Sequence, residues 1–133
     1  MNQDESRRAS PRPVFHAGRL VVEVLFWPAL FLVIWGELSP MPVIEGAAND
    51  KVLHFVAYFG LAAMAGAGLK ARLSAIKAVV ALIVIGGLLE ILQGLVGRDM
   101  SVFDELANAA GAIAGGGLAR LVVEPLRRRF AGD

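Results

Sequence analysis

Nine polar residues stand out, because their side chains can bind ions or ligands, form hydrogen bonds or transfer protons and they lie in or beside apolar stretches. They are Asp50, Lys51, His54, Tyr58, Glu90, Gln93, Arg98, Asp104 and Asn108. Imidazole and carboxyl groups act as general acids and bases, and lysine and arginine bind phosphate through charge-assisted hydrogen bonds. The sequence contains no H-E-x-x-H, no G-x-S-x-G and no P-loop, so it lacks the signatures of zinc proteases, serine hydrolases and P-loop NTPases.

Glu90 is the least expected of these residues, because it lies inside an apolar run, GGLLEILQGLVGR (86–98). A charged side chain in lipid costs several kcal/mol, so such residues usually face the interior of a helix bundle and pair there. We therefore expect Glu90 to face other helices, with His54, Lys51 or Arg98 as its partner.

The overall composition is that of a membrane protein. Hydrophobic residues make up 56% of the chain, against about 45–50% in soluble domains, and the mean hydropathy is +0.62. The absence of cysteine excludes disulfides, thiolate metal sites and cysteine nucleophiles. A net charge of +1 gives no reason to expect a nucleic-acid partner.

A membrane-crossing helix needs about 20 mostly apolar residues. Four stretches of the sequence approach or exceed this length, at residues 20–36, 52–69, 75–97 and 102–123. We predict an all-α bundle of four transmembrane helices over 19–123, between a disordered cytoplasmic tail (1–18) and a basic cytoplasmic tail (124–133). The basic residues before the first stretch also resemble a signal peptide, but no clear cleavage site follows it, so we expect an uncleaved helix.

Lysine and arginine are distributed unequally between the two sides of these spans. Of the 13 basic residues, all but Lys51 and Arg98 lie before the first span, in the loop between the second and third spans or the first turn after it, or from Arg120 near the end of the fourth span onward. Basic residues concentrate in cytoplasmic loops. We therefore predict that both termini are cytoplasmic, which also supports the weakly hydrophobic fourth span.

Most of the polar residues lie at one depth in the predicted membrane. At about 1.5 Å per residue, six side chains of the last three spans fall within about 10 Å of the outer surface: His54, Tyr58, Glu90, Gln93, Asp104 and Asn108. Small residues lie below them, including Gly111 and Gly115 in a G-x-x-x-G pattern that permits close helix packing. We predict an outward-facing polar pocket above a tightly packed base, with the first span covering one side.

Several of these residues also have purely structural interpretations. Lys51 and Arg98, at helix ends, are placed to extend toward lipid headgroups. Asp104 and Ser101 are rival N-caps for the fourth span, and a lone His54 is more often a satisfied polar residue than a ligand. Gly111 and Gly115 commonly serve packing alone.

Three ordered motifs resemble segments of the VanZ-like family of small integral membrane proteins. They are NDKVLHFVAYFG (49–60), EILQ (90–93) and GRDMSVFDELANAAGAIAG (97–115). The resemblance covers about residues 50–117, and it places all nine polar residues at positions that the family shares without giving any of them a chemical role. It implies a multi-pass protein of the bacterial inner membrane, in a family associated with teicoplanin and glycopeptide resistance and hence with the cell envelope.

Three functions follow as hypotheses. The first is a non-catalytic protein that binds a polar-headed envelope component, such as a lipid-linked precursor or a phospholipid, in the outward pocket. The second is a small membrane enzyme that acts on a lipid-linked phosphate or ester by acid–base chemistry of His54 with Glu90 or Asp104. The third is transport or proton coupling through Glu90, which requires an oligomer of identical chains. We predict no cofactor and no metal, since the strongest metal set, His54, Glu90 and Asp104, lacks recognisable ligand spacing.

Overall fold

The computed structural model describes residues 13–39, 47–69, 72–97 and 99–131. In chain order, the elements are α1 (Pro13–Leu38), α2 (Ala47–Gly68), α3 (Arg72–Leu95), α4 (Val102–Leu118), the π-helical turn η2 (Ala119–Val123) and α5 (Glu124–Ala131). The described residues contain helices and no strands. The predicted all-α architecture is therefore confirmed.

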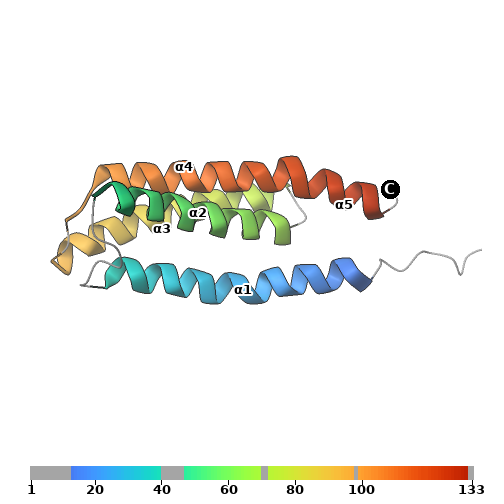
Figure 1. Ribbon diagram of the computed structural model, residues 1–133, viewed down its shortest axis with the longest axis horizontal. Coiled ribbons are helices and arrows are strands. Elements are labelled where there is room, and N and C mark those ends of the chain that lie inside the picture. The colour runs from blue at the N-terminus through green and yellow to red at the C-terminus, as the bar shows by residue number, and fades with distance from the viewer. Residues whose placement is uncertain (1–12, 40–46, 70–71, 98, 132–133) are drawn as a thin grey trace, which may run out of the picture.

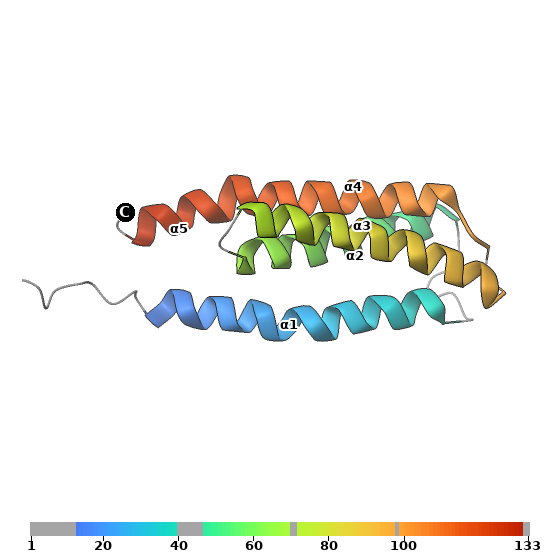
Figure 2. The same cartoon turned by 180° about the vertical axis from the view of Figure 1, so that it is seen from behind.

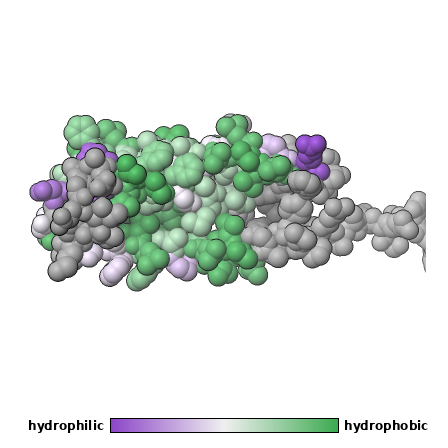
Figure 3. All heavy atoms as spheres, in the orientation of Figure 1, coloured by the Kyte–Doolittle hydropathy of each residue, from purple (hydrophilic) through white to green (hydrophobic). Residues whose placement is uncertain are grey.

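Four helical stretches are long and apolar enough to cross a membrane: Leu20–Leu38, Asp50–Gly68, Leu73–Leu95 and Val102–Leu126. Large apolar side chains cover their outer surfaces, among them Trp27 and Phe31, which are 68% and 66% exposed. Figure 3 shows this apolar surface over the middle of the bundle. Because such an exposed apolar surface is stable only in contact with lipid, the chain is a multi-pass membrane protein.

The helices run alternately up and down, with α2 at the centre of the bundle. α2 packs against α4 most extensively and also contacts α3 and α1, whereas α1 lies against α2 and α3 (Figures 1 and 2). One end of the bundle contains the end of α1, the start of α2, the end of α3 and the start of α4. The other end contains the start of α1 and α5.

The predicted G-x-x-x-G pair is the point of closest approach between α2 and α4. A methyl group added at Gly111 would collide with the backbone carbonyl of Phe55, and one added at Gly115 would collide with the carbonyl of Phe59. Both glycines are buried. The missing side chains let the two backbones come together, and this contact fixes the register of α4 against α2.

Helical structure extends beyond the predicted spans at both ends of the chain. α1 begins at Pro13, inside the segment predicted as a disordered tail, and proline suits the first turn of a helix because its missing N–H is not needed there. The predicted basic tail contains α5, which continues α4 through the wider turn η2. Residues 1–12 and 132–133 of these tails lie outside the described residues.

A short turn joins α3 to α4, as expected from the sequence. Gly97 has a φ of +84°, a left-handed conformation that glycine adopts without steric cost. Ser101 then takes the N-cap position of α4, but its side chain makes no capping hydrogen bond. The backbone carbonyl of Ser101 instead accepts hydrogen bonds from the N–H groups of Asp104 (3.0 Å) and Glu105 (3.3 Å). This turn brings the polar end of α4 beside that of α3.

Candidate functional site

Polar side chains from all four spans gather at the end of the bundle where α4 begins. Six of them are less than one-tenth exposed: Glu37, His54, Glu90, Gln93, Asp104 and Asn108. Tyr58 is buried beside them at 1% exposure, and Asp50 and Lys51 lie at the partly exposed edge. We call this set, together with Glu105, the polar cluster. Burial of so many polar groups is costly unless they bind one another or a ligand.

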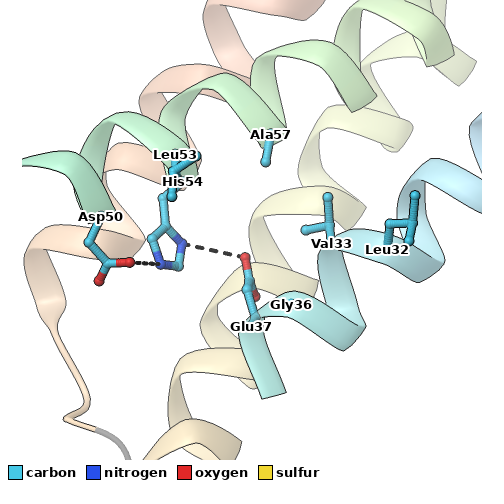
Figure 4. A pocket seen from close by; sticks show the side chains of 8 residues that line it. All are labelled: Leu32, Val33, Gly36, Glu37, Asp50, Leu53, His54 and Ala57. Carbon is cyan, nitrogen blue, oxygen red and sulfur yellow. Dashed lines mark ion pairs between the residues drawn. The ribbon is translucent and has the colours of Figure 1, made fainter. Parts of the chain in front are cut away.

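His54, on α2, is the hub of the polar cluster. Its Nδ1 donates a hydrogen bond to Oδ1 of Asn108 on α4 at 3.0 Å. The same nitrogen lies 3.4 Å from Oε1 of Glu37 on α1. The other ring nitrogen, Nε2, lies 3.9 Å from Oδ1 of Asp50, one helical turn earlier on α2 (Figure 4). One imidazole therefore connects three helices.

Glu37 is a member of the polar cluster that the sequence analysis missed. Its Oε2 accepts a hydrogen bond from the Tyr58 hydroxyl at 3.4 Å, and its backbone carbonyl accepts one from Nε2 of Gln93 at 3.0 Å. The signal was present in the sequence, because Glu37 follows the first apolar run at the depth of His54. The first span therefore contributes to the site as well as covering it.

The start of α4 contributes two carboxylates with different partners. Oδ1 of Asp104 lies 3.3 Å from the ammonium group of Lys51 on α2. Glu105, also missed from the sequence, accepts a hydrogen bond of 3.4 Å from Nδ2 of Asn108. Gly86 on α3 leaves the space that these groups occupy, since a methyl group there would lie 2.8 Å from Oε2 of Glu105. Asp104 thus pairs across helices and does not cap α4.

Glu90 is buried, as its position in an apolar run led us to expect, but its hydrogen bond is to the backbone. Its Oε2 accepts a hydrogen bond from the N–H of Ser101 at 3.0 Å. Its Oε1 is buried with no hydrogen-bond partner among the described residues. Of its expected partners, Lys51 pairs with Asp104 and His54 contacts Glu37, while Arg98 lies outside the described residues.

A cavity of about 160 Å³ opens beside the polar cluster, between α1 and α2. Glu37, Asp50 and His54 form its polar wall, and Leu32, Val33, Gly36, Leu53 and Ala57 complete it (Figure 4). We call it the polar cavity. The sequence predicted a pocket formed by polar groups of the last three spans, with the first span covering one side. In the structure the cavity lies between α1 and α2, and Glu37 of α1 is part of its wall.

A second cavity of about 350 Å³ lies further along α1, toward the other end of the bundle. It is lined mostly by apolar side chains of three helices, among them Phe26 and Trp27 on α1, Met64 on α2 and Ala78 on α3, and Glu23 on α1 also borders it. We call it the apolar cavity. Both cavities are bordered by α1 and α2, so they share one seam.

Carboxyl groups outnumber basic groups in the polar cluster. Its carboxyl groups are those of Glu37, Asp50, Glu90, Asp104 and Glu105, and its basic groups among the described residues are Lys51 and His54. Such a site favours cations and hydrogen-bond donors over anions. Ligand atoms of Asp50, His54 and Asp104 lie within 4.8 Å of one another, a grouping compatible with a metal ion.

No known protein family, curated protein sequence or solved structure matches this chain.

Proposed function

We propose that this chain is a VanZ-like protein of the bacterial inner membrane that binds a polar-headed lipid of the cell envelope. The headgroup lies in the polar cavity, and the hydrocarbon chain follows the seam between α1 and α2. The protein acts by binding, and both termini face the cytoplasm. The polar cavity then faces the outer surface, where envelope lipids are assembled and used.

The observation that carries this proposal is the alignment of the two cavities along one seam. On α1, Val33 borders the polar cavity and Phe26 borders the apolar cavity. On α2, Ala57 borders the polar cavity and Met64 borders the apolar cavity. Each pair is separated by two helical turns, which corresponds to about 10 Å along the helix axis. A polar cavity and an apolar cavity at this distance along one seam match the shape of an amphiphile.

The chemistry of the polar wall narrows the class of headgroup. Glu37, Asp50 and His54 offer carboxylate oxygens and an imidazole nitrogen to the cavity, which suit hydroxyl or ammonium groups of a sugar or amine. Lys51 was expected from the sequence to bind phosphate, but its ammonium group is already paired with Asp104. We therefore propose that a hydroxyl- or ammonium-bearing group enters the polar cavity.

The exposure of α1 supports entry of a lipid from the side. Only 6% of the most apolar window of α1 is buried, against 28–33% for the other three spans. A helix with so little buried surface separates from its neighbours at low energetic cost. Lipid then reaches the seam directly from the bilayer, without passing through water.

The proposal is tested by mass spectrometry of the lipids that remain bound after purification in detergent. Replacement of Ala57 by tryptophan fills the polar cavity, whereas the same change at Val56, which is 57% exposed on the neighbouring face of α2, leaves the cavity open. We expect a specific lipid to be retained by the wild type and by Val56→Trp and lost from Ala57→Trp. Identical lipid content in all three proteins would refute the proposal.

A further inference from the structure

Three side chains of the polar cluster direct metal-binding atoms toward one point. They are Asp50 and His54, one turn apart on α2, and Asp104 in the first turn of α4, and their ligand atoms all lie within 4.8 Å of one another. His54 and Asp104 are each 5% exposed. The metal set weighed from the sequence had Glu90 in place of Asp50. Asp50 and His54 are four residues apart on α2, and Asp104 joins them only when α2 packs against α4.

The hydrogen bonding of His54 leaves the appropriate ring nitrogen for a metal. Asn108 donates to Glu105 through Nδ2, which identifies its Oδ1 as the acceptor for His54. Nδ1 of His54 therefore carries a proton, and in the neutral ring the lone pair is on Nε2, facing Asp50. Metal-binding histidines are typically oriented in this way, by a hydrogen bond from the nitrogen that does not bind the ion.

The distance between His54 and Asp50 suits two ligands of one metal ion better than a direct hydrogen bond. Nε2 of His54 is 3.9 Å from Oδ1 of Asp50, which is too long for a hydrogen bond. Two ligand atoms at about 2.0–2.2 Å from a tetrahedral Zn²⁺ lie about 3.4 Å apart. The separation of 3.9 Å between Nε2 of His54 and Oδ1 of Asp50 is close to this distance between two ligand atoms.

An independent observation comes from Asp104. Its Oδ1 is buried and makes no hydrogen bond to any described residue. The ammonium group of Lys51 lies 3.3 Å away as an ion pair, and the Lys51 side chain is 40% exposed. A buried carboxylate oxygen without a hydrogen bond is energetically costly. A metal ion bound at this point would coordinate Oδ1 and take the place of the Lys51 ammonium group beside it.

We propose that Asp50, His54 and Asp104 bind a divalent transition-metal ion of the Zn²⁺ type. One imidazole nitrogen and two carboxylate oxygens are ligands that Zn²⁺ accepts, and three protein ligands leave a coordination position open. Asp50 and His54 also line the polar cavity, so the open position adjoins it. This site does not depend on lipid binding, and metal binding is measured without lipid.

The first test uses Zn²⁺ and the full chain purified in detergent. After incubation and removal of free metal, elemental analysis should show one Zn²⁺ per chain. X-ray absorption of that sample should show a single imidazole among oxygen ligands. Failure to retain Zn²⁺, or a spectrum without imidazole, would overturn the proposal without the need for any variant.

Variants then locate the ion. His54→Gln and Asp104→Asn should abolish retention of Zn²⁺, whereas Asp99→Asn, at an exposed residue, and His16→Gln, near the start of α1, should retain it. Asn108→Ala should weaken binding about 10–100-fold, because it removes the group that orients His54. Equal retention by His54→Gln and the wild type would place the ion elsewhere and refute the site.

A variant that binds Zn²⁺ more tightly gives a further test, because a misfolded variant would bind the ion more weakly. Lys51→Met removes the cation that competes for Asp104, so it should bind Zn²⁺ more tightly than the wild type. Lys77→Met, at an exposed lysine in the first two turns of α3, is the matched control and should bind as the wild type does. Weaker binding of Zn²⁺ by Lys51→Met would show that Lys51 does not compete with the ion for Asp104, and the proposal would fail.

Discussion

The carboxylate of Glu37 lies 3.4 Å from Nδ1 of His54, and this contact joins the most exposed helix of the bundle to its polar interior. Along its apolar length, most side chains of α1 are exposed on the outer surface of the bundle. At its end, however, Glu37 is 8% exposed and contacts groups from α2 and α3. Glu37 therefore holds the end of α1 to the polar cluster, while Phe26, Leu30 and Val33 pack the helix against the apolar core.

The pair formed by Glu37 and Tyr58 should contribute measurably to stability. Their hydrogen bond is buried, so Glu37→Gln and Tyr58→Phe should each lower the free energy of unfolding. The double variant should lose less of this free energy than the two single variants lose together. We expect a coupling free energy of about 1 kcal/mol from this double-mutant cycle, measured by unfolding in mixed micelles. Strict additivity would mean that the two groups do not interact.

Removal of the Gln93 side-chain amide should loosen the end of α1. Nε2 of Gln93 donates to the Glu37 carbonyl, one of the helix-terminal carbonyls that have no partner within the helix. In Gln93→Leu this buried carbonyl loses its donor, at a cost of about 1–3 kcal/mol. Hydrogen exchange should become faster in the last turns of α1, and Leu92→Ala, at a more exposed neighbour, should leave that exchange rate unchanged.

The two glycines of α4 that differ most in their surroundings provide a matched pair. Gly115→Ala places a methyl group against the Phe59 carbonyl, whereas a methyl group at Gly117 meets nothing within 4 Å. Gly115→Ala should destabilise the bundle by about 1–3 kcal/mol, while Gly117→Ala should be neutral or stabilising by up to about 1 kcal/mol. Unfolding by SDS measures both, and equal stabilities would contradict the close contact.

The proposed orientation is testable by labelling, since the chain has no cysteine of its own. Lys77 lies in the first two turns of α3 and Asp99 follows the end of that helix, and both residues are exposed. In intact bacteria an impermeant maleimide should label Asp99→Cys, and it should label Lys77→Cys only after the cells are opened. The reverse pattern would place both termini outside, and labelling of both in intact cells would show that α3 does not cross the membrane.

The sequence alone was sufficient for the four spans. Bilayer thickness requires about 20 apolar residues for each crossing helix, and this requirement can be read from any one segment. The turn between α3 and α4 was also readable, because Gly97 and the polar residues beside it interrupt the apolar pattern. These features depend on neighbouring residues in the chain, so no knowledge of the other helices was needed.

Part of the polar cluster was also accessible from spacing. Distance along a helix gives the depth of His54 and Glu90, and the 100° rotation per residue gives the face on which Gly111 and Gly115 lie together. The structure brings these groups to one end of the bundle and to one helix contact. Depth and face are properties of single helices, which explains why sequence reasoning reached them.

Only the tertiary structure decided which polar group contacts which. Lys51 pairs with Asp104 and not with Glu90, Glu37 joins the site from a helix expected only to cover it, and the open volume lies beside α1. These outcomes depend on how each helix is rotated and how closely it approaches its neighbours. That geometry is set by side-chain packing between segments far apart in the chain, which no single segment encodes.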